Sequence, residues 1–253
     1  EAAAPVGAAV DHQPPAVIRH EERAVAAMAP VRRLDPGARA QEGELHGRRF
    51  GRAVLAEIRI GTSGWHYDHW VGPFYPEGTK AADFLAFYAE RFGAAEINNS
   101  FYQLPSAETL AHWRDSVPDG FVFTAKASRY ITHMKKLKDP RASLERFLER
   151  IAVLDPKLGP VLFQLPPNWR ANVQRLEALL DALPTERRAA VEFRDDSWWI
   201  DDVYAALARF GAAFCPFELA GQQAPLEVTA DFVYLRLHGP GDAYQGAYDD
   251  DRL

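Results

Sequence analysis

The chain of 253 residues has a single cysteine and no apolar run that approaches the ~18 residues of a membrane-spanning helix. One cysteine, Cys215, excludes an internal disulfide and fits a reducing, cytoplasmic setting. Within Phe214-Cys215-Pro216-Phe217 it is expected to be a small buried apolar residue, and a reactive thiol is the less favoured alternative. The composition therefore points away from membrane proteins and from disulfide-rich domains.

A strong charge of one sign is also missing. The net charge of -6 argues against a general nucleic-acid coating function, although it says nothing about local patches. One local exception is a basic run made of Lys126, Arg129, His133, Lys135, Lys136 and Lys138. Lys126 and His133 lie close to an expected strand and are candidates for anion binding. The three later lysines are better explained as a solvated helix face.

Lysine is absent from residues 1–56, where Ala, Pro, Gly and Arg dominate and no apolar periodicity persists. Such a composition predicts a largely disordered N-terminal extension. Because the chain starts at Glu1, Met28 or a residue further downstream is an alternative start. Residues 57–253 are expected to form one domain, since 47% hydrophobic content suffices for a full core.

From Glu57 onward, short apolar runs alternate with segments of helical periodicity, which is typical of repeated βα units and a parallel sheet. Strands are expected at Ile58 to Gly61, Ala94 to Asn98, Phe121 to Lys126, Val161 to Gln164, Ala189 to Arg194, Ala213 to Phe217 and Val233 to Leu237. Helices are expected at Ala81 to Phe92, Ser106 to Ser116, Arg141 to Leu154, Asn172 to Leu183 and Asp201 to Phe210. Ser106 and Asn172 are suitable N-caps.

This repeat predicts an α/β fold of the TIM type, a (β/α)8 barrel whose last βα unit is expected beyond Leu253. A doubly wound open sheet is the second choice. It is disfavoured because no glycine-rich phosphate-binding loop follows the first expected strand.

The strand from Val191 carries unusual charges. Glu192 and Arg194 share one face of it, while Val191 and Phe193 share the other. Unpaired charges on an inward face are costly, so they either neutralise each other or project into a polar cavity.

The same pattern recurs in other strands, with polar members at the carboxyl end, which carries function in barrels. The recurring inward positions are Glu96, Asn98, Lys126, Gln164, Arg236 and His238. They indicate a binding site at this end. The alternative is a structural charge network inside the barrel.

Aromatic residues follow several expected strands and could stack on bases or sugars at the rim. They are Trp65, Tyr67, Phe101, Tyr102, Tyr130, Trp169, Trp198, Trp199, Tyr244 and Tyr248. For any single ring, packing of a long loop is about as good an explanation.

Six ordered motifs resemble those of the YecE-like proteins, the domain of unknown function 72. They are Gly61-Thr62-Ser63-Gly64-Trp65, Glu96-Ile97-Asn98-Asn99-Ser100-Phe101-Tyr102, Lys126 with Ile131-Thr132-His133, Gln164-Leu165-Pro166-Pro167, Glu192-Phe193-Arg194 with Ser197-Trp198, and Arg236-Leu237-His238-Gly239 with Tyr244 and Tyr248. The resemblance implies a TIM-type barrel over Ile60 to Tyr248 and no established activity. The chain departs from the family in lacking a closing strand with an asparagine-rich turn, and in carrying Glu218 where the family tends to have aspartate.

The leading functional hypothesis is a hydrolase-type enzyme acting on a phosphorylated, nucleotide or nucleic-acid substrate. Lys126, Arg194, Arg236 and His238 would hold anionic oxygens. Glu96 or Glu192 would act as general base or as ligand of a divalent metal, the candidate cofactor, and His238 is a third candidate catalytic residue. The remaining candidates for substrate contact are Asn98, Tyr102, His133, Gln164, Trp198 and Tyr244.

Two alternatives remain open. In a glycoside-acting enzyme, Glu96 and Glu192 would form the catalytic pair and the tryptophans would bind sugars, but the surrounding cations would keep both carboxylates ionised. In a non-catalytic protein, the aromatic rim and basic run would bind a nucleotide or single-stranded nucleic acid, and binding would weaken with salt.

Overall fold

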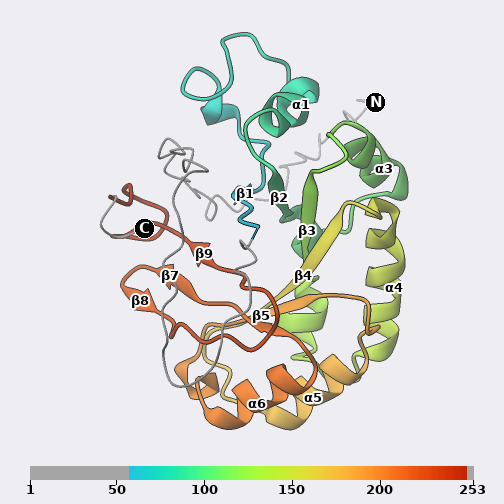
Figure 1. Cartoon of the computed structure of the whole chain (residues 1–253), viewed down its shortest axis with the longest axis vertical. Helices are drawn as coiled ribbons and strands as arrows, with labels where there is room; N and C mark the ends of the chain where they lie inside the picture. The colour runs from blue at the N-terminus through green and yellow to red at the C-terminus, as the bar shows by residue number, and fades with distance from the viewer. Residues whose placement is uncertain (1–56, 250–253) are drawn as a thin grey trace, which may run out of the picture.

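The computed structural model describes residues 57–249, so the expected extension 1–56 lies outside the described residues. Six strands form one parallel sheet in sequence order (Figure 1). They are β1 (Gly61–Ser63), β2 (Ala94–Ile97), β3 (Val122–Lys126), β4 (Leu158–Leu165), β5 (Ala189–Phe193) and β6 (Ala213–Phe214). The predicted alternation of strands and helices around a parallel sheet is confirmed.

The sixth expected strand is interrupted at Pro216, which has no N–H to contribute to a ladder. The chain continues as β7 (Phe217–Leu219), which pairs antiparallel with β8 (Gln222–Gln223) and parallel with β9 (Arg236–Leu237). Strand β9 is the C-terminal end of the seventh expected strand, and residues 233–235 are not part of it. These three strands form a second sheet in the order β8-β7-β9.

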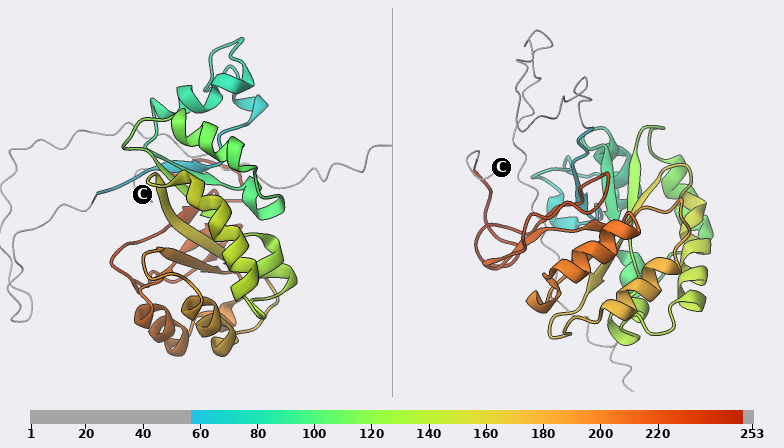
Figure 2. Two further views of the ribbon diagram at one scale, coloured as in Figure 1. Left: turned by 90° about the vertical axis from the view of Figure 1, so that its right-hand side faces the viewer. Right: turned by 60° about the horizontal axis from the view of Figure 1, so that its bottom comes forward.

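The helices are α1 (Phe84–Ala89), α2 (Asn99–Tyr102), α3 (Ala107–Asp115), α4 (Arg141–Ile151), α5 (Val173–Asp181) and α6 (Asp201–Arg209). Helices α3 to α6 lie along the outer side of the sheet in Figures 1 and 2. Both expected caps are present, because Ser106 Oγ accepts from the Thr109 N–H and Asn172 Oδ1 accepts from the Arg175 N–H, each at 3.0 Å.

Short helical turns complete the connections. The 3-10 turns are η1 (Asp68–Trp70), η2 (Ala81–Asp83), η4 (Ala152–Leu154) and η5 (Asp196–Trp198), and η3 (Tyr130–Met134) is a π-helical turn. The basic run does not form the expected helix face, because Lys136, Leu137 and Asp139 have positive φ angles and make a turn.

Strand parity separates two environments, as the sequence predicted. On the outer face, Val191 and Phe193 pack in the core beneath the helices, and Ala95 and Ile97 pack in a neighbouring cluster. On the inner face, small apolar residues make a separate layer, which comprises Leu162, Ala190, Ala213 and Cys215 under Phe232 and Tyr234. Cys215 is fully buried there, as expected.

Arg236 on β9 donates to Glu96 on β2, which shows that the sheet curls around this inner layer. The described residues nevertheless form no closed sheet, so the fold is established as a curved parallel α/β sheet and not as a closed eight-stranded barrel. Among residues 57–249, no helix has the length and apolar character needed to cross a membrane.

Candidate functional site

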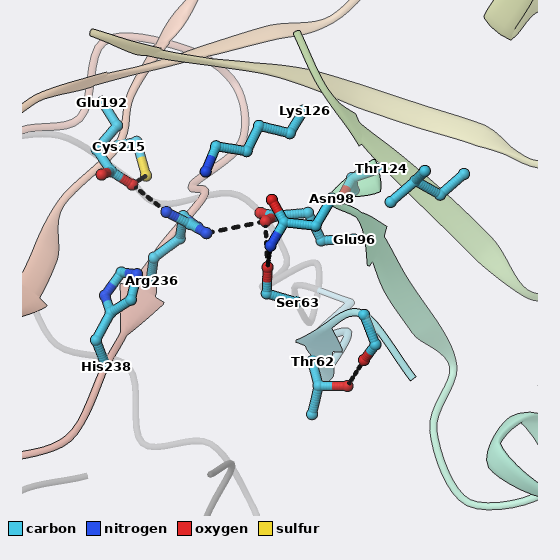
Figure 3. Close-up of polar contacts among 12 residues, drawn as sticks. Thr62, Ser63, Glu96, Asn98, Thr124, Lys126, Glu192, Cys215, Arg236 and His238 are labelled. Carbon is cyan, nitrogen blue, oxygen red and sulfur yellow. Dashed lines mark hydrogen bonds and ion pairs between the residues drawn. The ribbon is translucent and has the colours of Figure 1, made fainter. Parts of the chain in front are cut away.

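A chain of ion pairs lies on the inner face, above the small apolar layer (Figure 3). The Arg236 guanidinium donates to Glu96 Oε1 at 2.9 Å and to Glu192 Oε2 at 2.7 Å. Arg194 donates from Nε to the other oxygen of Glu192. Residues from β2, β5 and β9 thus meet at the carboxyl ends of the strands, as their parity predicted.

Glu96 has further partners that sequence reasoning missed. Ser63 Oγ donates to Glu96 Oε1 at 2.6 Å, and Tyr234 donates its hydroxyl proton to Glu96 Oε2 at 2.8 Å. The Tyr234 hydroxyl also lies 2.8 Å from Thr124 Oγ1. Tyr234 shares the parity of Arg236 and could have been found by extending that pattern two residues towards the N-terminus.

The two glutamates are ionised at neutral pH. Burial by itself would raise the pKa of Glu192, but the charges of Arg236 and Arg194 outweigh it and lower the pKa to about 2. Burial likewise opposes ionisation of Glu96, and the charges of Arg236 and Lys126 lower its pKa below the usual value. Neither carboxyl group is therefore available as a general acid.

His238 is neutral and has a defined tautomer. Burial, reinforced by the charge of Arg236, lowers its pKa to about 4. Its Nδ1 lies 3.1 Å from the Glu218 carbonyl oxygen, which can only accept, so the proton resides on Nδ1. The Nε2 lone pair faces Arg194 Nη2 at the long distance of 3.5 Å.

Lys126 and His133 both contact the Phe101 ring. The Lys126 ammonium is 4.4 Å from the Phe101 ring centre, and the His133 ring meets the same ring edge-on at 5.0 Å. Burial, together with the charges of Lys126 and Arg129, lowers the pKa of His133 to about 4. His133 therefore adds no charge near neutral pH.

The cluster carries an excess of positive charge. Three cationic side chains, Lys126, Arg194 and Arg236, surround the carboxylates of Glu96 and Glu192, while His238 is neutral. Lys126 is 7% exposed and Arg236 is 9% exposed, so this charge is poorly screened by water. Such a site favours an anion.

Two amide side chains adjoin the cluster. Asn98 donates from Nδ2 to Ser63 Oγ at 2.8 Å, while its buried Oδ1 has no hydrogen-bond partner among the described residues. Gln164 is half-buried and stands in register with Glu192 on the neighbouring strand. An unpartnered buried acceptor costs free energy unless a ligand or water donates to it.

The aromatic residues that were expected at the rim differ in their burial. Trp198 is fully buried in the outer core, where it stacks on Phe193 and donates its indole N–H to the Trp169 carbonyl at 2.6 Å. The structure therefore does not bring Trp198 to the cluster. Tyr102 is 57% exposed beyond β2, and the half-buried Tyr244 ring lies 5.6 Å from the His238 ring.

The donor set does not fit a divalent cation. No group of three or more His, Cys, Asp and Glu side chains with metal-binding geometry occurs between residues 57 and 249. Both inner carboxylates already bind arginine, and Lys126 adds a positive charge beside them. Cation binding would require breaking these pairs.

Comparison with known proteins places the site in a family. The family described as "Protein of unknown function DUF72" matches residues 59–253. Curated relatives include UPF0759 protein YecE of Escherichia coli K12, 32% identical over 140 residues, which are 54% of this chain and 48% of the relative. UPF0759 protein YunF of Bacillus subtilis 168 is 30% identical over 165 residues, 60% of this chain and 56% of the relative. The chain thus spans about half the length of the curated relatives it matches.

Solved structures agree. A DUF72 family protein from Thermotoga maritima has a TM-score of 0.66 and 30% identity, covering 77% of this chain and 79% of the other. Another from Enterococcus faecalis has a TM-score of 0.61 and 20% identity, covering 77% and 75%, and supports the fold alone. The resemblance inferred from the six motifs is confirmed, and the chain belongs to the DUF72, or YecE-like, family of proteins of unknown function.

Proposed function

We propose that the inner cluster binds a phosphate-bearing ligand and that the protein is a hydrolase acting on a phosphoester. The observation that carries the proposal is the excess of buried cationic side chains over carboxylates at the carboxyl ends of the strands. A buried positive charge attracts an anion more strongly than an exposed one does.

The residues have different roles in this proposal. Lys126 and Arg194 supply charge to phosphate oxygens, and Arg194 adds a planar set of donors. Arg236 already donates to both Glu96 and Glu192, so it is a positioning residue that holds the two strands together. Gln164 and Tyr244 contact the remainder of the ligand.

His238 is the proposed proton acceptor. Its Nδ1–H is held by the Glu218 carbonyl, which leaves Nε2 with a lone pair. A water molecule would give its proton to Nε2 while its oxygen bonds to phosphorus and the bond to the leaving oxygen breaks. The proton on Nε2 is then transferred to that leaving oxygen.

Glycoside hydrolysis is less well supported. That chemistry requires one carboxyl group of the pair to carry a proton. Here burial opposes ionisation, yet Arg236 with Lys126 or Arg194 keeps the pKa of both Glu96 and Glu192 below the usual value. The pair acts as an anchor for cations instead.

Nucleic-acid binding has one specific observation in its favour. Tyr102 and Tyr130 are exposed by 57% and 45%, and Lys135 Nζ lies 5.7 Å from the Tyr130 ring centre. These residues follow β2 and β3, beside Lys126, and could stack on bases whose phosphate enters the cluster.

We also propose that the curved sheet has the strand arrangement of a TIM-type barrel, whose ligands bind at this end.

A thermal-shift series tests the anion site. The wild-type chain and Lys126→Met would be heated with inorganic phosphate, a mononucleotide, single-stranded DNA or a neutral sugar. A ligand that binds the native state raises the melting temperature. We expect phosphate and the nucleotide to stabilise the wild type and to have little effect on Lys126→Met.

Lys138→Met is the matched control, because Lys138 is an exposed lysine of the same basic run. It should respond to phosphate as the wild type does. Stabilisation by neutral sugars alone, or an equal response of Lys126→Met, would refute the anion site. If phosphate binds, release of p-nitrophenol from p-nitrophenyl phosphate by the wild type, and its loss in His238→Asn, tests hydrolysis.

A further inference from the structure

The hydrogen bonds around Glu96 determine which way the Asn98 amide points. Glu96 is ionised and cannot donate, so Ser63 Oγ must give its only proton to Glu96 Oε1, 2.6 Å away. Ser63 Oγ can then only accept from Asn98, whose Nδ2 lies 2.8 Å away. A flipped amide would place two acceptors against each other.

This orientation leaves Asn98 Oδ1 turned away from Ser63, and Figure 3 shows it on the side of the amide opposite the dashed bond. Asn98 is only 4% exposed, and its buried Oδ1 has no hydrogen-bond partner within residues 57–249. Asn98 and Lys126 directly follow Ile97 and Ala125, which pair in register on the neighbouring strands β2 and β3, and the charge of Lys126 acts on Glu96. An acceptor that needs a donor therefore lies beside a cation that attracts an anion.

We infer that the ligand is a hydroxyl-bearing phosphate, such as a phosphorylated sugar or polyol, with a hydroxyl that donates to Asn98 Oδ1 while the phosphate lies towards Lys126. This inference rests on the proposed anion site and specifies its substrate class. A ligand without the hydroxyl leaves a buried acceptor unsatisfied, and sites built to bind a hydroxyl reject such analogues. Ser63 is a specificity-determining residue, because it fixes the orientation of the Asn98 side-chain amide.

Two ligands that differ only in hydroxyl groups test the inference. Glycerol 3-phosphate and n-propyl phosphate have the same phosphate and the same three-carbon chain, and isothermal titration calorimetry would give both dissociation constants. We expect the wild type to bind glycerol 3-phosphate about tenfold more tightly, as one hydrogen bond to a buried group warrants. Asn98→Ala should bind the two equally.

Ser63→Ala provides a second test, because it removes the group that orients the amide without touching the ligand. The free amide can then turn its NH2 group inward, so discrimination should fall to less than threefold while n-propyl phosphate still binds. Asn99→Ala, an exposed asparagine next in the chain, should keep the wild-type ratio.

The outcomes separate the two proposals. Equal binding of both ligands by the wild type overturns the hydroxyl inference and leaves the anion site intact. Failure of both ligands to bind overturns the anion site itself. Full discrimination by Ser63→Ala overturns the role of Ser63, and this result is informative even if Asn98→Ala does not fold.

Discussion

Glu192 lies fully buried between two arginines, and each of its carboxylate oxygens accepts from a different one. Its strand parity placed it on the inner face, but nothing local indicated that both oxygens would be occupied. Full occupancy matters because a carboxylate that already holds two cations is a poor general base. At this scale the structure therefore shifts the proposed proton transfer from the glutamates to His238.

The protonation of His238 predicts how stability depends on pH. Its pKa is about 4 in the folded protein against 6.5 for an unperturbed histidine, because burial first, and then the charges of Arg236 and Arg194, disfavour the imidazolium, while Glu192 acts in the opposite direction. The unfolded chain therefore binds more protons between these values. The stabilisation is fully present above pH 6.5 and is lost as the pH falls towards 4.

We expect His238 alone to lower the free energy of unfolding by about 2 kcal/mol between pH 7 and pH 5. Urea unfolding of wild type and His238→Asn at both pH values measures this difference. The variant should lose less stability than the wild type on acidification. Equal losses would mean that His238 is protonated in the folded protein at pH 5.

Strands β1 and β2 approach each other so closely that one position permits only glycine. A Cβ on Gly61 would lie 2.0 Å from the Ala94 carbonyl oxygen, where Gly61 and Ala94 pair in register. Because that oxygen belongs to the backbone of the neighbouring strand, it cannot move without disturbing the sheet. At the scale of the element, this glycine determines where β1 lies and therefore where Ser63 points.

Gly61→Ala should destabilise the protein by about 3 kcal/mol or more through overpacking against this backbone. Gly93→Ala is the control, since no atom lies within 4 Å of a Cβ at Gly93. Thermal or urea unfolding of both variants measures the effect. Similar stabilities for the two would contradict the close approach of β1 to β2.

At the scale of the whole molecule, one side chain connects the two ends of the curved sheet. Arg236 on β9 donates to Glu96 on β2, 140 residues earlier in the sequence, and to Glu192 on β5. Since β9 has only two residues and pairs along β7, its ladder hydrogen bonds are few. The buried ion pairs thus hold β9 against the interior.

Arg236→Ala should cost about 3 to 5 kcal/mol of unfolding free energy, because it leaves two buried carboxylates without their shared cation. Faster amide hydrogen exchange in β9 should accompany the loss. Arg188→Ala is the control, since Arg188 forms an exposed pair with Asp231 whose removal should cost less than about 1 kcal/mol. Unchanged exchange in β9 would show that other contacts hold the strand.

Local sequence rules alone determined much of this protein. The order of strands and helices, the caps at Ser106 and Asn172, and the inward orientation of Glu96, Lys126, Glu192 and Arg236 all follow from short-range periodicity and propensity. The family motifs added the identity of the fold family, which comparison with relatives confirmed. These properties are readable because each depends on residues a few positions apart.

Only the tertiary structure decided which inward groups meet. The pairing of Arg236 with two glutamates joins three strands, and the orientation of Asn98 depends on Ser63, 35 residues away, and on the ionisation of Glu96. Trp198 is an example of a position that the sequence left open, because a tryptophan after a strand can bind a ligand at the rim or pack in the core. In the structure it is fully buried and stacks on Phe193. Such contacts depend on the curvature of the sheet, and no local pattern in the sequence encodes the distance across it.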